Sequence, residues 1–359
     1  MGVEPMNEPE IRPQTPATPP IQVFVQQPGG GLFLRVLSIV GWTGFGFCFI
    51  LMLGQYAVLS DYFDASEGIY EKFESGAKLG SDKVAIIDVT GVIMDGEGFV
   101  KQQIQRIRDD ANVKGVVVRV DSPGGTVTAS DYIYHHLKKL REERNLPMVV
   151  SMGGMATSGG YYISMAVGET PDTIFAEPTT TTGSIGVIIS HYDISGLLAR
   201  FDVKDDSISS HPRKQMLSMT RPIPEEHREL LQGYVNESFT RFKEIVQQGR
   251  PALLAAPQRL DELATGEIFT AQKAMEHGLV DKIGFLEDAV AKVQELAGLN
   301  ASKTRVVRYE RPASLFEFSP LALASSSDSA QMSALLELAT PRAYYLSTAL
   351  PPFLTSFVH

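Results

Sequence analysis

The sequence predicts an α/β domain with a mostly parallel sheet, preceded by one transmembrane helix. Three observations lead to this class. Short apolar runs alternate with segments whose apolar residues recur at helical spacing. The strand-like runs are apolar throughout, which is typical of parallel strands covered by helices on both faces. A long stretch without charged side chains lies near the N-terminus and predicts the membrane helix.

The N-terminal region divides into three parts. Residues 1–31 contain "EPMNEPEIRPQTPATPPIQ", a composition that predicts a disordered, Pro-rich tail. Residues 36–60 carry no charge, and a helix of this length exceeds the roughly 30 Å of membrane hydrocarbon. We therefore expect a lipid-contacting anchor over 32–60 and a polar connector over 61–82.

Two other interpretations of the apolar stretch are a buried core helix and a cleaved signal peptide. The run is too long for a signal peptide, and some 30 mostly polar residues precede it. Arg35 on its N-terminal side favours a cytoplasmic N-terminus. We expect a single-pass protein of the cell's inner membrane, with the remainder of the chain extracytoplasmic.

Strand-like and helix-like segments alternate from residue 84 onward. The expected strands cover 84–93, 115–125, 148–150, 173–176 and 184–190. The expected helices cover 99–113 and 128–143, and beyond residue 220 the chain turns helical, at 224–249 and 285–298. Parallel strands joined by helices require right-handed crossovers, so these segments predict one covered sheet with a helical C-terminal part.

The folded domain is expected over 83–311, because the composition changes at about residue 312. The tail that follows, 312–359, is apolar but interrupted by "SSSDSAQ" and by several prolines. Proline breaks helices, so we do not expect a second membrane span there. One hypothesis is that this tail occupies the substrate groove of the protein, or is trimmed by it.

Composition excludes several functional classes. The 359-residue chain has a net charge of −10 and no long run of Lys or Arg, which argues against nucleic acid as a partner. Its single cysteine, Cys48, cannot form an intrachain disulfide. No His/Cys/Glu spacing suggests a metal site and no phosphate-binding loop is present, so we expect neither a metal nor a cofactor.

Two glycine turns follow predicted strands, "DSPGG" at 121–125 and "ATSGG" at 156–160. Ligand sites form at the carboxyl ends of parallel strands. A turn that leads into a helix leaves free backbone N–H groups, which suit an oxyanion. Ser158 would lie beside such donors, which makes it a candidate nucleophile. The alternative is that both motifs are only tight turns.

The residue that takes the proton of Ser158 is harder to find. Of the seven histidines, His191 alone follows a predicted strand and could complete a triad. A lysine is the alternative base. Its pKa would have to fall from about 10.4 towards neutrality, which costs about 4 kcal/mol. The pattern of residues does not choose among the lysines.

Four long motifs, in order, resemble the signal peptide peptidase A family of membrane-anchored serine peptidases. They are "VDSPGG", "SMGGMATSGGYYIS", "TGSIGVI" and "ATGEIFTAQKAMEHGLVDKIG", and the likeness runs from about 83 to 296. The family is related to the proteolytic subunit of Clp protease. The resemblance therefore implies a Clp protease/crotonase-like fold.

The resemblance also assigns roles to five residues. Ser158 matches the family's nucleophile, and Lys214, in "SSHPRKQMLSMTR", matches its general base. Ser184 matches a serine that helps to hold the lysine amine. The backbone N–H groups of Gly125 and Gly159 match the oxyanion hole.

The activity implied by the resemblance is that of a membrane-bound endopeptidase that degrades remnant signal peptides. The implied assembly is a homo-oligomeric ring, with eight copies and with neighbouring protomers completing the groove. Two rivals remain open. One is a Ser-His triad peptidase with His191 as base. The other is a protein without peptidase activity, either an inactive membrane scaffold or an acyl-CoA enzyme of the crotonase kind.

Overall fold

The computed structural model describes residues 31–63, 68–311 and 343–346. The chain forms two compact units, Met1–Phe63 and Asp64–His359, which are treated separately. The predicted N-terminal tail lies almost wholly outside the described residues. So does the predicted C-terminal tail, apart from 343–346.

The first unit contains one long helix, α1 (Leu32–Phe63). Its segment Arg35–Leu53 has a mean hydropathy of 2.1, and none of that segment is buried. This helix is long and apolar enough to cross a membrane, and it begins where the sequence predicts the anchor.

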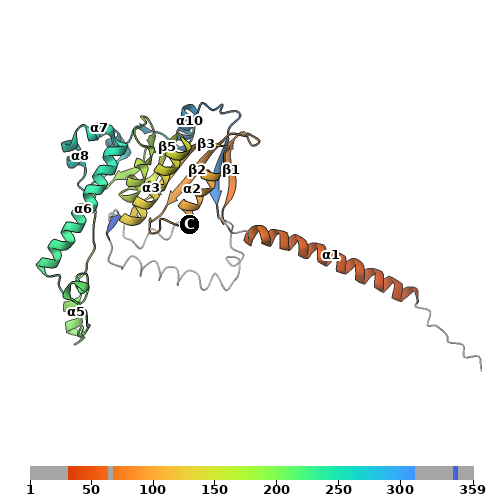
Figure 1. Ribbon diagram of the computed structural model, residues 1–359, viewed down its shortest axis with the longest axis horizontal. Coiled ribbons are helices and arrows are strands. Elements are labelled where there is room, and N and C mark those ends of the chain that lie inside the picture. Colours follow the sequence, from red (N-terminus) through yellow and green to blue (C-terminus); the bar gives the residue numbers. More distant parts are fainter. Residues whose placement is uncertain (1–30, 64–67, 312–342, 347–359) are drawn as a thin grey trace, which may run out of the picture. The chain divides into compact units, whose positions relative to one another are not determined.

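The second unit is built on a nine-stranded sheet (Figure 1). Its central order is β1-β10-β2-β3-β5-β6-β9, with β7 joined to β5 and β8 joined to β7. The strands are β1 (Tyr70–Gly76), β2 (Lys83–Thr90), β3 (Val113–Ser122), β5 (Met148–Thr157), β6 (Ile174–Ala176), β7 (Thr181–Gly183), β8 (Ile268–Thr270), β9 (Lys282–Ile283) and β10 (Arg305–Glu310). Only the β1–β10 and β7–β8 pairs of this sheet are antiparallel, which confirms the mostly parallel α/β fold.

Helices cover both faces of the sheet because successive side chains of a strand point to opposite sides. In β2, Ala85 and Ile87 face the larger core cluster, whereas Val84 and Ile86 face the smaller one. The larger cluster includes side chains of α2 (Phe99–Asp109), α3 (Val127–Arg144), α4 (Gly159–Ser164) and α6 (Glu225–Gly249). The smaller cluster includes side chains of α10 (Leu286–Leu296).

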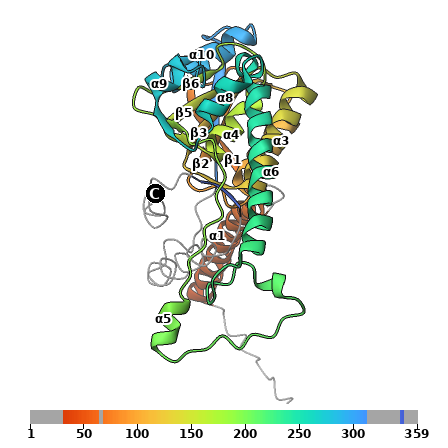
Figure 2. The same cartoon turned by 90° about the vertical axis from the view of Figure 1, so that its left-hand side faces the viewer.

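Short elements connect these layers. They are β4 (Gly124–Thr126), η1 (Met165–Val167), α5 (Ser195–Arg200), η2 (Pro212–Gln215), α7 (Pro251–Leu254), α8 (Pro257–Leu263), α9 (Ala271–Glu276) and β11 (Tyr344–Leu346). The segment 190–224, which contains α5 and η2, is called the arm below. Figures 1 and 2 show α5 beyond the N-terminal end of α6, away from the sheet.

The expected strand at 184–190 is wrong. The strand lies just before it, at β7, and beyond β7 only Ile188 makes a bridge, to Tyr344. Gly183 and Ser184 have φ values of 84° and 51°, which turn the chain out of the ladder. The Ser184 N–H then donates to the carbonyl of Glu267. The connector predicted over 61–82 also contains a strand, β1, which pairs with β10.

Candidate active site

Ser158 lies at the junction of β5 and α4, in a backbone conformation that L residues rarely adopt. Its φ and ψ are 54° and −113°. The Ser158 N–H donates to the Gly183 carbonyl at 2.8 Å, and its own carbonyl accepts from Tyr162 N–H at 2.8 Å. The residue is 1% exposed, yet its Oγ has no hydrogen-bond partner among the described residues. Buried hydroxyls normally have a partner, so the Ser158 hydroxyl stands out as a candidate reactive group.

The two glycine turns lie side by side, and the space between them excludes larger side chains. A Cβ added to Gly124 would overlap the Tyr345 carbonyl oxygen, and would stand 2.7 Å from Gly159 N and 3.1 Å from Ser158 Cβ. A Cβ added to Gly159 would stand 3.1 Å from Gly125 N. The two backbone amides predicted as an oxyanion hole are therefore brought together next to Ser158.

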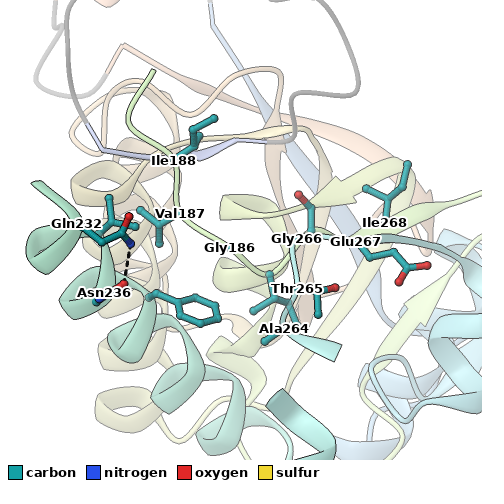
Figure 3. Close-up of a pocket in the computed structure, with 14 residues that line it drawn as sticks. Gly186, Val187, Ile188, Gln232, Asn236, Ala264, Thr265, Gly266, Glu267 and Ile268 are labelled. Atoms are coloured by element: carbon teal, nitrogen blue, oxygen red, sulfur yellow. Dashed lines mark hydrogen bonds between the residues drawn. The ribbon is translucent and has the colours of Figure 1, made fainter. Parts of the chain in front are cut away.

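Ser184 lies beside the nucleophile turn because β7 pairs with the end of β5, with Gly183 opposite Thr157. A cavity of about 650 Å³ begins at Ser184. In Figure 3 this cavity is bounded by Gln232 and Asn236 of α6 on one side and by the turn 264–268 on the other. The carboxylate of Glu267 belongs to that turn. The cavity thus reaches Ser184, the residue that follows the strand paired with the end of β5.

The C-terminal strand β11 fills part of the site. It pairs antiparallel with β4, so that Tyr345 lies opposite Gly125. The Tyr345 side chain is fully buried, and its hydroxyl donates to the carbonyl of Ser238 in α6 at 2.8 Å. The sequence suggests a tail that occupies the groove but does not single out Tyr345. The only signal was a pair of tyrosines within an apolar, Pro-broken segment.

Lys214 is exposed on η2, and the structure does not bring it to Ser158. Its neighbour Arg213 pairs with Glu226 in the first turn of α6. Glu226 precedes Ser238, beside the site, by 12 residues, which at about 1.5 Å per residue is about 18 Å along the helix. Within the described part of the chain, the Lys214 ammonium makes no hydrogen bond or ion pair that would hold it in place.

His191, the candidate triad histidine, is engaged elsewhere. Its Nε2 lies 3.0 Å from the carbonyl oxygen of Ser218, within the arm. No hydrogen bond joins it to Ser158 among the residues described. Over the same residues, no group of three or more His, Cys, Asp or Glu side chains could hold a metal ion.

A buried serine on a strained turn, next to two glycine amides in an α/β sheet, is the arrangement that the nucleophile and oxyanion hole of a serine hydrolase require. The comparisons with known proteins specify the class: the chain belongs to peptidase family S49, whose family model matches residues 140–300. That range contains Ser158, Ser184 and Lys214. The protein is therefore a serine peptidase, and peptides are its substrates.

Several curated relatives share this assignment. The chain is 37% identical over 230 residues to a putative protease of Synechocystis sp., covering 64% of this chain and 80% of the relative. It is 36% identical to the putative signal peptide peptidase SppA of Enterococcus faecium, covering 65% and 69%. It is 39% identical to protease 4 of Salmonella typhi, covering 60% of this chain but 35% of that longer protein.

Among solved structures, a mutant of ClpP1 from Listeria monocytogenes is similar to this chain. The TM-score is 0.39 and the sequence identity 16%, with 57% of this chain and 94% of that chain covered.

Proposed function

We propose that the protein is a membrane-bound endopeptidase that uses a Ser158/Lys214 dyad to degrade remnant signal peptides and other membrane-associated peptides. The observation that carries the proposal is the buried Ser158 hydroxyl, which has no partner among the described residues and adjoins the amides of Gly125 and Gly159. Similarity to a putative signal peptide peptidase supports the substrate class. The apolar helix α1 supports the membrane location.

In the proposed reaction, the neutral Lys214 amine takes the proton of Ser158 Oγ as that oxygen attacks a peptide carbonyl. The amides of Gly125 and Gly159 donate to the oxyanion that forms. Collapse of the tetrahedral intermediate breaks the C–N bond, and the lysine returns the proton to the leaving nitrogen. Water then hydrolyses the acyl-enzyme with Lys214 again as base.

We propose that the lysine comes from a second copy of the chain. Lys214 lies on the exposed arm, whereas the cavity that opens at Ser184 is free to receive a side chain from outside. An amine inserted there would meet Ser184, whose neighbour Gly183 accepts a hydrogen bond from the Ser158 N–H. Removal from water favours the neutral form of an amine, which is the form that a general base requires.

The arm has the character of an interface between copies. Its large apolar side chains are exposed to solvent: Tyr192, Leu197, Phe201, Val203 and Ile208. Apolar side chains gathered on one segment are typical of protein–protein contacts. A head-to-tail contact of this kind closes into a ring when its rotation permits, and eight copies is the number implied by the family resemblance.

The proposed location is the inner membrane, with the N-terminus cytoplasmic and the catalytic unit extracytoplasmic. Substrates released within or near the bilayer would then reach the groove without crossing the membrane. A reporter fused after residue 311 that is active only outside the cytoplasm tests the orientation. A signal from the cytoplasmic side would contradict it.

Complementation between two inactive variants tests the dyad. Ser158→Ala and Lys214→Ala are each expected to abolish hydrolysis of a quenched peptide by the full chain in detergent. Co-expressed in equal amounts, they should regain about a quarter of the wild-type activity, since each shared site then has the two intact residues by chance. Lys204→Ala is the matched control, because Lys204 is an exposed lysine of the same arm.

Each contrary outcome identifies a different error. Activity in Ser158→Ala would refute the nucleophile. If Ser158→Ala and Lys214→Ala are each inactive and remain inactive when co-expressed, both residues of the dyad act within one chain. Activity that survives Lys214→Ala but is lost in His191→Ala would favour the triad.

A further inference from the structure

The turn that carries Lys214 is held through its backbone, whereas the lysine side chain is free. Within η2, the Lys214 N–H donates to the His211 carbonyl at 2.9 Å, and His211 Nδ1 accepts from the Arg213 N–H at 3.2 Å. Lys214 is exposed, and its ammonium has no hydrogen bond or ion pair among the described residues. A single turn of helix is unstable on its own in water, so other contacts must fix η2.

Arg221 joins this turn to a second part of the arm. Its Nη1 donates to Oε1 of Gln215, the residue after Lys214, at 2.5 Å. Its Nε and Nη2 donate to Asp205 Oδ2, at 3.2 and 2.6 Å. The planar guanidinium can bind two partners at once because its N–H groups point in fixed directions. Arg221 therefore closes the loop 205–221, which contains η2, and the three side chains of Asp205, Gln215 and Arg221 are called the clamp below.

The Asp205 carboxylate is the fixed end of the clamp, because both of its oxygens are used. Oδ1 accepts from the Ser207 N–H at 3.0 Å and from the Ser207 hydroxyl. Oδ2 accepts from the Thr220 hydroxyl in addition to Arg221. The Asp205 side chain is 13% exposed, against 40% for Arg221. A single exposed ion pair contributes little, but several charge-assisted hydrogen bonds to one shielded carboxylate form a network that holds its geometry.

The end of the loop is also tied to the beginning of the arm. His191 Nε2 donates to the Ser218 carbonyl at 3.0 Å. The Ile194 N–H donates to the Met219 carbonyl at 2.8 Å. The loop is thus anchored on both sides of η2, by bonds that do not involve Ser158. The backbone of the turn is fixed while the amine that it carries remains available to another group.

We propose that Arg221 is a positioning residue for the general base: through Asp205 and Gln215 it holds η2 in the orientation from which the Lys214 amine reaches a Ser158 site. The inference rests on the proposed function. Proton transfer requires the two heavy atoms to approach to about 2.6–3.2 Å. A misplacement of about 1 Å can cost about 100-fold in rate, even when the substituted residue is far from the chemistry. Arg221 itself takes no part in the proton transfer.

Graded variants of the clamp should give graded losses. Arg221→Ala removes both links and should lower kcat by about 10- to 100-fold. Arg221→Lys keeps a positive charge beside Asp205, but one ammonium does not reproduce the two-partner fork, so its loss should be smaller. Gln215→Ala breaks only the link next to Lys214 and should cost about 10-fold or less. KM should change little in all three, because the clamp belongs to the arm and lines neither β4 nor the cavity at Ser184.

Complementation tests which half of the site Arg221 serves. In the full chain purified in detergent, Arg221→Ala alone should keep about 1–10% of the wild-type kcat on a quenched peptide. Co-expressed with Ser158→Ala, it should rise to about a quarter of wild type, because the Ser158→Ala copies supply intact arms. Co-expressed with Lys214→Ala, it should stay at or below its own level, because no copy has an intact arm. Arg228→Ala is the matched control and should keep wild-type kcat, since Arg228 also pairs with a carboxylate, that of Glu225, but lies beyond the arm.

The opposite pattern would overturn the proposal. Recovery of Arg221→Ala with Lys214→Ala but not with Ser158→Ala would place the defect in the serine half of the site. Wild-type kcat in Arg221→Ala would also refute the positioning role. If Arg221→Ala recovers with neither, although Ser158→Ala and Lys214→Ala recover with each other, its chain has lost its fold. Arg221→Lys in the same two mixtures then decides between the same two outcomes.

Labelling of Ser158 by a fluorophosphonate separates this inference from the proposed function. If Lys214→Ala is labelled and hydrolyses peptides like wild type, the dyad is refuted and the role of Arg221 with it. If Lys214→Ala is inactive and Arg221→Ala is fully active, only the positioning role is refuted. If the dyad lies within one chain, no mixture recovers. Arg221→Ala should then slow the labelling of Ser158 when Lys214 is present and add no further loss to Lys214→Ala, and an added loss would overturn the proposal.

Discussion

Replacing Gly159 by alanine is expected to perturb the proposed oxyanion hole, because the added Cβ points toward the Gly125 amide. The added Cβ would overlap Ser130 Oγ, and would stand 3.1 Å from Gly125 N and 3.2 Å from Gly124 Cα. The Ser130 hydroxyl is removable, because its hydrogen bond goes to the carbonyl of Thr126, the N-cap residue of its own helix α3. The contact of the new Cβ with the backbone of Gly124 and Gly125 remains in every variant that has alanine at position 159.

The two contacts affect different quantities. Overlap with Ser130 should lower the free energy of unfolding by about 1–3 kcal/mol, as overpacking does. The second substitution, Ser130→Ala, should restore most of that loss. The contact with Gly125 moves its amide by a few tenths of an ångström, out of the roughly 2.7–3.1 Å range in which an oxyanion is bound. Since complete loss of such a donor costs about 10²- to 10³-fold in kcat, we expect a loss of roughly 10- to 100-fold from the displacement.

The assay is kcat/KM on a quenched peptide, measured beside a denaturant titration for each variant. Gly159→Ala should lose both activity and stability, and the double variant with Ser130→Ala should regain stability but not activity. Gly154→Ala is the control, because its Cβ would meet nothing nearer than Asp121 Oδ1, at 3.7 Å. Wild-type kcat/KM in a stable double variant would refute the role given to these amides.

Two further predictions concern stability. Arg250 is 7% exposed and pairs with Asp281 at 2.8 Å. Arg250→Ala should therefore lower the free energy of unfolding, measured by urea titration, by about 3–5 kcal/mol. The control Lys282→Ala, which removes an exposed ion pair with Asp172, should lower it by less than about 0.5 kcal/mol. Hydrogen bonds from Ser207 and from other arm side chains hold the pKa of Asp205 below its usual 3.8, so Asp205 stabilises the arm at neutral pH and that contribution is lost as the pH falls below about 3.8. Hydrogen-exchange protection factors in the arm, which correct for the slower intrinsic exchange in acid, should fall at acid pH in wild type and already at pH 7 in Asp205→Asn; an arm equally protected in both at pH 7 would contradict this.

The parts of the fold that were predictable are those whose pattern is local. The strands around Ile86 and Val117 are continuous apolar runs, so their burial on both faces could be inferred from the sequence alone. The edge strand β1 and its neighbour β10 each carry three charged residues and have no such signal. The expected strand at 184–190 failed because positive φ at two successive residues, Gly183 and Ser184, is not visible in apolar periodicity.

The residues of the candidate site also differ in whether a local sequence pattern marks them. The glycines around Ser158 mark it as a candidate nucleophile, because a glycine-rich turn after a strand is visible in a short stretch of sequence. Lys214 is predicted only by the family resemblance, since no local pattern marks a proposed base 56 positions away from its serine. The Tyr345 ring packs against the rings of Tyr162 and Phe242, and both residues are far from Tyr345 in the sequence. Contacts of that range leave no periodicity to detect.

The position of β10 in the sheet sets an order for biosynthesis. β10 lies between β1 and β2, with Arg305 paired to Lys83 and Glu310 paired to Tyr70. Because a ribosome delivers the chain from its N-terminus, β2 keeps one unpaired edge, and β1 has no neighbour, until residues 305–310 have emerged. Such distant pairings form slowly. Residues 344–346 emerge later still, so a nascent chain completes its main sheet before β11 can pair with β4.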